Sequence, residues 1–515
     1  MPPHVVIENP ILNPPFEEPG RHFRFDESGI TNEVVEERRT SSYFVAIPPA
    51  KRTKAKQAFE TEWTADRVEE NRDINRIREQ VGLWRQGGRL HTTPTTKRLI
   101  EYWTDEARER RLFFAQIEAL DTAIYLAEAA DKVGQSWIPD LLAEKAAAAN
   151  PGLLRVAHKM ATGSGKTVVM AMLVAWQTLN KVANPQDARF TSRFLVVTPG
   201  ITIRDRLRVL LPSDPNNYYR VMDLVPPEMA ENLGQASIVI TNFHSFISRT
   251  KVANASKLHR QLMDPSAITE SPDEMVRRVC RELGGSKTQI VVLNDEAHHC
   301  YRRRPEPEVE EKLTGDEARE AKNRDEEARV WLSGLEAVNR KIGIKTVYDL
   351  SATPFFLNGS GYKAGTLFPW VVSDFSLIDA IESGIVKVPR VPISDDTGGT
   401  QGVTYRDLWP RISGALPKRG RKATDTVDQP ILPPELQGAL TSLYSNYEKA
   451  YKQWDVSENR ATSTPPVFIV VCANTGVSKL VYDYLAGYET AGTKGTTPVR
   501  SGALELFSNA REGRW

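Results

Sequence analysis

The sequence has few cysteines and no long run of apolar residues. Its 515 residues include only Cys280, Cys300 and Cys472, which stand far apart and without metal-binding spacing. So few thiols suit a reducing cytosol, and we expect a cytoplasmic protein. No apolar stretch approaches the ~20 residues that a membrane-spanning helix needs, so no membrane association is expected. The first twenty residues also lack the basic and apolar regions of a secretory signal.

The chain lacks an excess of charge of either sign. Lysine and arginine total 67 against 66 aspartate and glutamate, a formal net charge of +1. A compact DNA-binding domain is often strongly basic, so this balance disfavours a simple, permanently bound DNA module. It does not disfavour a motor, which needs only a basic track along one cleft. At about 150 residues per domain, the length predicts two to four domains.

Short apolar runs, each bounded by turn residues, recur along the chain from about residue 97. They cover residues 153–157, 194–197, 237–240, 290–293 and 347–350. Helical patterns separate most of them, for example at 168–179. Strands that are apolar throughout, in alternation with helices, indicate a parallel sheet covered on both faces. The fold class predicted is therefore α/β.

A phosphate-binding loop is predicted where the first of these strands meets the following helix. Residues 160–167 read Met-Ala-Thr-Gly-Ser-Gly-Lys-Thr. Glycines allow backbone N–H groups to surround phosphates, and the helix N-terminus adds positive potential. Lys166 would reach the β- and γ-phosphates of ATP, and the Thr167 hydroxyl would bind Mg²⁺. Met160 replaces the usual first glycine, which only opens the loop. The residues that would surround the phosphates are Thr162, Gly163, Ser164 and Gly165.

An acidic motif follows another apolar strand, about 130 residues later. Residues 290–299 read Ile-Val-Val-Leu-Asn-Asp-Glu-Ala-His-His. The carboxyl end of a strand is where α/β sheets bind ligands. We expect Asp295 to hold Mg²⁺ through water, and Glu296 to orient the attacking water as a general base. His298 would sense the γ-phosphate, whereas His299 has no assigned role.

Further strand ends carry small polar residues. The strand at 347–350 ends in Ser351, Ala352 and Thr353, which we expect to couple the acidic motif to a neighbouring domain. Pro199 and Gly200 follow one strand and lead into Arg204, Arg206 and Arg208. Another strand ends in Thr241, Asn242 and Phe243. These groups can hold a DNA backbone without reading its sequence. The alternative is ordinary loop chemistry, with the arginines on a solvated helix face.

An adenine contact is predicted upstream of the loop. Residues 113–116 read Phe-Phe-Ala-Gln. The Gln116 amide offers the donor and acceptor that the N6/N7 edge of adenine needs, and a phenylalanine can stack on the ring. Gln116 precedes Lys166 by 50 residues, and an intervening helix at about 138–149 would account for that length.

The motifs MATGSGKT, VVTPG, ITNFHSF, VVLNDEAHH and LSATP, in this order, resemble those of superfamily-two DEAD/DEAH helicases. The phrases DAIESGIVKVPRVP and PVFIVVCANTGVSKLVYDYL are similar to the Res subunit of type III restriction-modification enzymes. The resemblance covers roughly residues 97–515. It implies two RecA-like domains that clamp ATP and act on double-stranded DNA, a nuclease domain of the PD-(D/E)xK kind, and a modification methyltransferase as partner.

The domain organisation expected from this resemblance is incomplete. It comprises an N-terminal accessory region at 1–95, a RecA-like P-loop domain at 96–392, a linker at 393–435 and the start of a second RecA-like domain at 436–515. Within these we expect a short strand at 42–47, a charged helix at 57–84, a solvated helical insertion at 303–330, a buried strand at 467–471 and a helix from 475.

The second domain shows no arginine that would reach the γ-phosphate, and no credible nuclease motif occurs before Trp515. We therefore expect a C-terminally truncated Res chain that binds ATP, hydrolyses it weakly and does not cut DNA alone. The full-length form would be an ATP hydrolase and a type III site-specific deoxyribonuclease. Two alternatives stay open: a nuclease-free helicase or remodeller in defence or repair, and a non-catalytic ATP-binding module.

Overall fold

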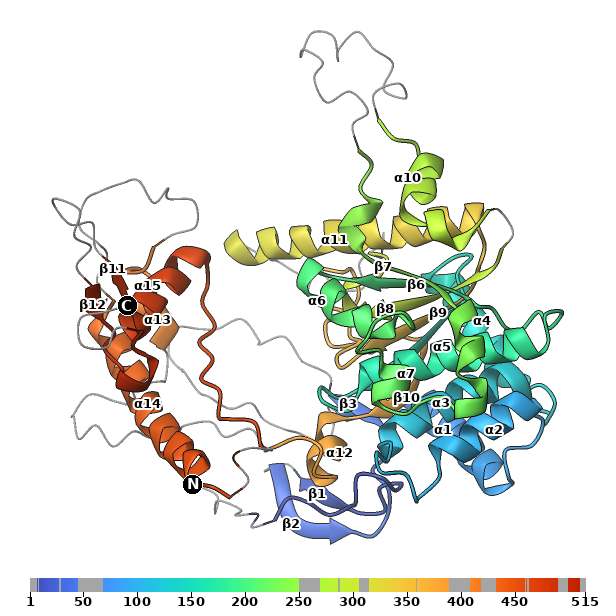
Figure 1. Cartoon of the computed structure of the whole chain (residues 1–515), viewed down its shortest axis with the longest axis horizontal. Coiled ribbons are helices and arrows are strands. Elements are labelled where there is room, and N and C mark those ends of the chain that lie inside the picture. The colour runs from blue at the N-terminus through green and yellow to red at the C-terminus, as the bar shows by residue number, and fades with distance from the viewer. Residues whose placement is uncertain are drawn as a thin grey trace, which may run out of the picture. The chain divides into compact units, whose positions relative to one another are not determined.

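A computed structural model describes most of the chain, which divides into two compact units, residues 1–388 and 389–515 (Figure 1). The described residues are 7, 9–26, 29–44, 68–249, 269–285, 288–304, 315–357, 359–388, 408–417, 432–458, 460, 463–489 and 499–509. Within them, no helix combines the length and the apolar character needed to cross a membrane.

The first unit is built on a six-stranded sheet in which every pair of neighbours is parallel. The strand order is β10-β5-β9-β8-β6-β7. The strands are β5 (Arg155–Met160), β6 (Arg193–Thr198), β7 (Ser237–Asn242), β8 (Ile290–Asp295), β9 (Ile344–Ser351) and β10 (Val371–Phe375). The predicted parallel α/β fold is confirmed. The strand β10 was not predicted from the sequence, because Ser373 and Asp374 interrupt its apolar run.

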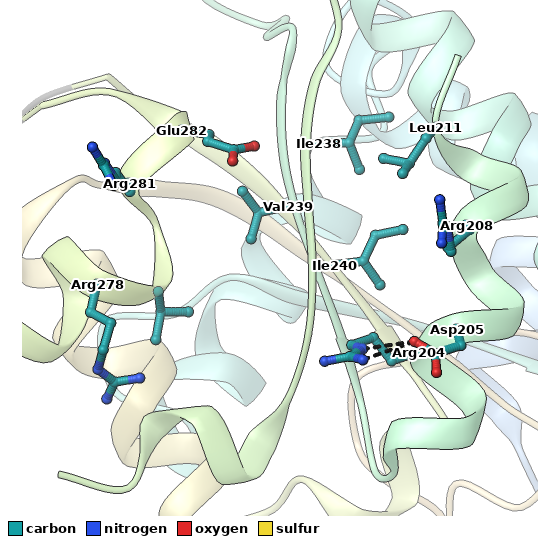
Figure 2. Close-up of a pocket in the computed structure, with 11 residues that line it drawn as sticks. Arg204, Asp205, Arg208, Leu211, Ile238, Val239, Ile240, Arg278, Arg281 and Glu282 are labelled. Atoms are coloured by element: carbon teal, nitrogen blue, oxygen red, sulfur yellow. Dashed lines mark hydrogen bonds and ion pairs between the residues drawn. The ribbon is translucent and has the colours of Figure 1, made fainter. Parts of the chain in front are cut away.

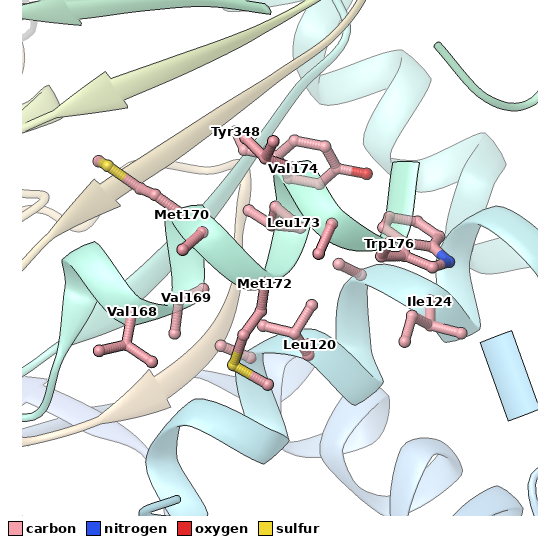
Figure 3. Packing of buried hydrophobic residues seen from close by; sticks show 14 of the residues in the cluster. Leu120, Ile124, Val168, Val169, Met170, Met172, Leu173, Val174, Trp176 and Tyr348 are labelled. Carbon is pink, nitrogen blue, oxygen red and sulfur yellow. The ribbon is translucent and has the colours of Figure 1, made fainter. Parts of the chain in front are cut away.

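Helices cover both faces of the sheet, and alternate strand residues enter two separate hydrophobic clusters. On one face, Val196 and Leu293 pack with α3 (Phe114–Ile124) and α5 (Lys166–Ala183). Figure 3 shows this packing, with Leu120 and Ile124 of α3 beside the apolar side of α5. On the other face, the neighbouring residues Val197 and Val292 pack with α10 (Pro272–Val279) and α11 (Gly315–Lys341). Burial on both faces explains why these strands are apolar throughout.

The described part of residues 1–95 packs on the same unit. It contains the hairpin β1 (His22–Asp26) and β2 (Gly29–Val35), and the paired strands β3 (Ser42–Phe44) and β4 (Val68–Glu70). Helix α1 (Arg72–Gln86) follows and lies against β10. The predicted strand at 42–47 is confirmed over the described residues 42–44. The predicted helix at 57–84 is confirmed over 72–84 but is wrong over 68–70, which form the strand β4. Residues 45–50 and 57–67 lie outside the described part.

Shorter helices connect these elements. The intervening helix predicted between Gln116 and the phosphate loop is present as α4. The connecting helices are α2 (Pro94–Trp103), the π-helical η2 (Tyr125–Ala129), α4 (Trp137–Ala149), α6 (Ile201–Arg206), η3 (Leu207–Leu210), α7 (Tyr218–Val221), η4 (Pro227–Met229), η5 (Glu231–Gln235), η6 (Phe243–Phe246), η7 (Arg281–Leu283), η8 (Ala297–His299) and α12 (Leu377–Glu382).

The helical insertion predicted at 303–330 is present as α11 over the described residues 315–330, and most of the side chains described there are at least partly exposed. Helix α11 continues beyond the predicted range, and its second half is part of the core. The side chains of Trp331, Leu335 and Val338 are fully buried. The dense charge of the segment marks only the outer side of a helix that covers the sheet. Residues 305–314 lie outside the described part.

The second unit contains helices α13 (Leu408–Ile412), α14 (Pro434–Asp455) and α15 (Thr475–Ala486), a pair of short strands β11 (Gly487–Glu489) and β12 (Val499–Ser501), and the turn η9 (Glu505–Phe507). The predicted helix from 475 is confirmed. The predicted buried strand at 467–471 is wrong: these residues form no strand. Val467, Ile469 and Val471 are 69%, 77% and 92% exposed. Only the alternate side chains, such as Val470, pack on the helices, because no described strand pairs with the segment.

Candidate active site

The phosphate loop connects the buried strand β5 to α5, which begins at Lys166. Gly163 and Gly165 have positive φ angles of 86° and 91°, a region that other residues rarely adopt. Ser164 is buried, and its hydroxyl donates to the carbonyl of Ala161 at 2.7 Å. The loop is therefore closed on itself at the N-terminus of a long helix, the geometry that binds phosphate groups. Met160 lies inside the core as the last residue of β5, so this position serves packing.

Gln116 lies against the phosphate loop. Its Oε1 accepts a hydrogen bond of 3.0 Å from the backbone N–H of Phe113 at the start of α3. A Cβ atom at Gly165 would stand only 2.0 Å from the Gln116 Nε2, so a larger residue there would force the Gln116 side chain to move. Phe113 stacks on Phe16 with ring centroids 5.9 Å apart. The structure thus brings Gln116 to the loop; its contact with adenine stays a prediction.

The acidic motif meets the phosphate loop. Asp295 ends β8, and Glu296 follows with φ 49° and ψ 50°, a left-handed conformation that is strained for a side chain of this type. The Glu296 Oε1 lies 3.7 Å from the Lys166 Nζ. Parallel strands place their carboxyl ends at one edge of the sheet, so two motifs about 130 residues apart in the chain form one site.

The surroundings of Asp295 raise the pKa of its carboxyl group. Burial and the negative charge of Glu296 raise the pKa of Asp295 to about 6, while Lys166 opposes the rise. Asp295 is only 8% exposed. A bound cation would relieve this penalty, because it favours the ionised carboxylate.

His298 links the acidic motif to the end of β9. Its Nδ1 lies 3.0 Å from the Ser351 hydroxyl and 3.5 Å from the Glu296 Oε2. Ser351 also accepts a hydrogen bond of 3.1 Å from the backbone N–H of Thr353. Burial, together with the charge of His299 and of Lys166, lowers the pKa of His298 to about 4, so the ring is neutral at pH 7. Glu296, His298 and Ser351 thus form a continuous series of contacts. Ala352 lies between Ser351 and Thr353 in the chain, and the coupling role of these residues stays a prediction.

The strand ends predicted to hold DNA are adjacent at the carboxyl edge of the sheet. β6 and β7 pair so that Thr198 aligns with Asn242. Pro199 and Gly200 are partly exposed, and the Thr198 hydroxyl donates to the Gly200 carbonyl at 2.9 Å. Thr241 and Asn242 are buried. The Phe243 ring stacks on Trp331 in the core, so its side chain serves packing.

Residues of the N-terminal segment support this site, although the sequence showed no chemistry there. The Arg38 guanidinium forms a two-pronged contact with the buried Glu118 of α3, with both N–O distances 2.7 Å. The backbone N–H of Phe114 donates to the carbonyl of Pro15 at 2.9 Å. Both contacts hold the start of α3, which carries Gln116. No local sequence pattern could reveal partners that lie 80 and 99 positions apart.

A second unpredicted contact reaches the loop from the end of the first unit. A Cβ atom at Gly163 would stand 3.4 Å from the Val386 side chain. Val386 follows α12, whose Glu382 carbonyl accepts from the backbone N–H groups of Leu12 and Asn13. The N-terminal segment and residues 380–386 are therefore packed together beside the phosphate loop.

The residues present fit a nucleotide and a magnesium ion. Lys166 and the loop N–H groups suit phosphate oxygens, and Thr167 with Asp295 offers the oxygen ligands that Mg²⁺ prefers. Among the described residues, no group of three or more histidine, cysteine or acidic side chains could hold a metal alone. Two protein oxygens plus substrate phosphates and water is the usual arrangement for magnesium at such sites.

Comparison with known protein families agrees with this geometry. Residues 114–356 match the family model described as "Type III restriction enzyme, res subunit", a family of DEAD/DEAH-box helicases with a RecA-like domain. The matched range contains Gln116, the phosphate loop, the acidic motif and the end of β9. It supports a helicase-like, ATP-dependent motor domain. No curated protein matches the chain.

Proposed function

Since residues 114–356 form a domain of the type III restriction enzyme res subunit family, we propose that this chain hydrolyses ATP to move on, or to switch on, double-stranded DNA. The observation that carries the proposal is the approach of Lys166 to Glu296, 3.7 Å apart, at the end of a parallel sheet. A cation that can bind phosphate and a carboxylate that can act as a base therefore lie side by side.

Each residue of the site has a distinct part in this reaction. The loop at 162–165 and Lys166 would bind the phosphates and neutralise charge that develops on the γ-phosphate. Thr167 and Asp295 would hold Mg²⁺, which shields the phosphate oxygens when bound. Glu296 would orient a water molecule and accept its proton. With ATP bound, Lys166 would exchange its present contact with Glu296 for phosphate, which frees the carboxylate.

The response to DNA would travel through the neutral His298. Its contacts with Glu296 and Ser351 join the base to the end of β9. We propose that Ser351, Ala352 and Thr353 pass movement between the nucleotide and the DNA, which Pro199, Gly200, Thr241 and Asn242 would hold by its backbone. Such contacts position a duplex without reading its sequence. A modification methyltransferase would supply the recognition, and a nuclease activity would accompany the motor in a complete enzyme.

Binding and hydrolysis of ATP by three variants test this proposal. Lys166→Ala should weaken binding of Mg²⁺ and a fluorescent ATP analogue, since the phosphates lose the cation at the start of α5. Glu296→Gln should keep binding but lower the hydrolysis rate by about 10²–10⁴-fold, the usual contribution of a general base. Hydrolysis should be measured with and without linear duplex DNA. Glu326→Gln, on the exposed side of α11, is the matched control.

The outcomes separate the motor from its alternatives. Equal hydrolysis by the wild type and by Glu296→Gln would contradict a base role and favour a non-catalytic ATP-binding module. Hydrolysis that depends on Glu296 but is unchanged by duplex DNA would contradict the proposed substrate while retaining the ATPase.

A further inference from the structure

The strand β7 is the edge strand of the sheet, and its outer side has no partner strand among the described residues. The Ser237 N–H donates to the Ser192 carbonyl beside β6, at 2.8 Å. In a parallel strand the N–H and C=O groups of one residue face the same neighbour, and the next residue faces the other side. The N–H and C=O groups of Ile238 and Ile240 therefore point away from the sheet. Within the described chain, no group forms a hydrogen bond to them.

This edge forms the floor of a hollow of 350 Å³, which the helical layers of both sheet faces also line (Figure 2). Ile238 and Ile240 point to the side where Leu211 lies, and Val239 points to the opposite side. The floor is thus apolar, with free backbone groups between its side chains. The lining residues are Arg204, Asp205, Arg208, Leu211, Ile238, Val239, Ile240, Arg278, Val279, Arg281 and Glu282.

The walls of the hollow carry net positive charge, with four arginines against two carboxylates. Arg204 pairs with Asp205 at 2.9 Å, and Arg278 pairs with Glu270 outside the hollow at 2.7 Å. Arg281 is exposed and forms no ion pair with another described residue. A ligand with carboxylates would find a free guanidinium there. It could also share the exposed Arg208, whose Nε lies 3.7 Å from the Asp214 Oδ2.

We propose that the β7 edge binds an extended acidic segment of a partner protein, which pairs with β7 as a seventh strand. Main-chain hydrogen bonds to Ile238 and Ile240 would supply register, and alternate side chains would pack on the two sides of the edge. Carboxylates of the segment would meet Arg208 and Arg281. The inference does not depend on the ATP site.

Shape and chemistry favour this occupant over two others. Because both helical layers line the hollow, it is concave, and it admits one strand more readily than the similarly walled edge of a second copy of this chain. The phosphates of a nucleic acid could bind the arginines. However, phosphates carry no hydrogen-bond donors for the outward carbonyls of Ile238 and Ile240. Only a polypeptide supplies both donors and acceptors at strand spacing.

A fluorescein-labelled hexapeptide of alternating valine and glutamate is the probe. We expect it to bind the whole chain, as measured by anisotropy, and to slow hydrogen exchange at the Ile238 and Ile240 amides by more than about tenfold, because these amides become hydrogen-bonded. The same peptide with N-methyl groups on alternate residues should bind far more weakly. A valine–lysine hexapeptide should not bind.

Charge variants complete the test. Arg281→Glu should weaken the valine–glutamate peptide about fivefold, since an exposed ion pair becomes a repulsion. Arg329→Glu, at an exposed position on α11, should leave binding unchanged. The proposal is overturned if the peptide leaves the two amides unprotected or if N-methylation has no effect. It is equally overturned if those amides are protected by a duplex oligonucleotide or by self-association, seen in sedimentation velocity, instead of by the peptide.

Discussion

The two edge strands of the central sheet, β10 and β7, differ in how their outward backbone groups are bonded. At the β10 edge, the carbonyl of Asp374 accepts from the Arg78 guanidinium at 2.7 Å, and its carboxylate binds Ser41 and Lys159, both at 2.6 Å. At the β7 edge, the corresponding backbone groups of Ile238 and Ile240 meet no described partner. One edge is covered by the chain itself, whereas the other has no covering strand among the described residues.

An exposed strand edge invites pairing with other chains, and proteins usually protect it with charge or cover it. Here the N-terminal segment covers the edge that lies next to β5 and its phosphate loop. The open edge lies farthest from β10 in the strand order. We propose that the covered β10 edge supports the nucleotide site and that the β7 edge is available for binding. The following changes test that distinction.

The largest loss of stability is expected at the closed edge, from Asp374→Ala. The change leaves the nearly buried Lys159 ammonium without its carboxylate, which costs about 3–5 kcal/mol for a buried pair. The free energy of unfolding in urea measures this. Asp205→Ala at the open edge is the matched control, since its pair is exposed and should change stability by less than about 0.5 kcal/mol. Equal losses would remove the contrast between the edges.

Glu118→Gln should have the next largest effect, with a distinct pH dependence. Burial alone would raise the pKa of Glu118, but the guanidiniums of Arg38, Arg78 and Arg85 lower it to about 2. A lowered carboxyl pKa adds stability that is present above the unfolded value of about 4.5 and is lost as the pH falls toward 2.

The variant should therefore be roughly 2–3 kcal/mol less stable than the wild type at pH 7, as expected for hydrogen bonds to charged groups. That gap should narrow as the pH falls below 4.5. Denaturant unfolding at several pH values measures it. A gap that stays constant down to pH 3 would show that Glu118 does not act through its charge.

Ser41→Ala should cost about 1 kcal/mol, since one buried hydroxyl loses its hydrogen bonds to Asp374 and Asn71. Thermal unfolding would detect the change. Nucleotide affinity should fall little, because the hydroxyl bonds to Asp374 and Asn71 and not to the phosphate loop. A large loss of affinity would instead place the N-terminal segment in the nucleotide site.

The smallest effect on stability is expected for Arg281→Glu at the open edge. The side chain is exposed, so the free energy of unfolding should change by less than about 0.5 kcal/mol. A clear destabilisation would mean that Arg281 serves the fold of this chain rather than a partner.

Much of the fold and of the site could be predicted where the signal was local. Short runs of adjacent residues were enough to predict five of the six sheet strands, the phosphate loop and the acidic motif. The strand β10 was missed because its polar Ser373 and Asp374 are satisfied by His158 and Lys159, more than 200 positions earlier. The strand wrongly predicted at 467–471 has the right apolar pattern, but the described chain supplies no strand beside it.

Contacts between distant segments escaped prediction for the same physical reason. The pairing of Arg38 with Glu118 and the approach of Val386 to Gly163 depend on how segments meet after folding. Residues 1–95 were predicted to be an accessory region, although Arg38 within them holds α3 through Glu118. The division of the chain into domains and the roles of the site residues stay predictions.

The place of β5 in the sheet also constrains the order in which the protein is synthesised and folded. Arg155 of β5 bonds to Asp349 across 194 positions, and His158 bonds to Ser373 across 215. A nascent chain that ends before residue 375 therefore holds the complete phosphate-loop sequence, while β5 still lacks at least one of its two neighbours, β9 and β10. Such long-range parallel pairing forms slowly. During translation, competence to bind ATP would thus arise only after the ribosome has delivered β9 and β10, well after the loop itself has emerged.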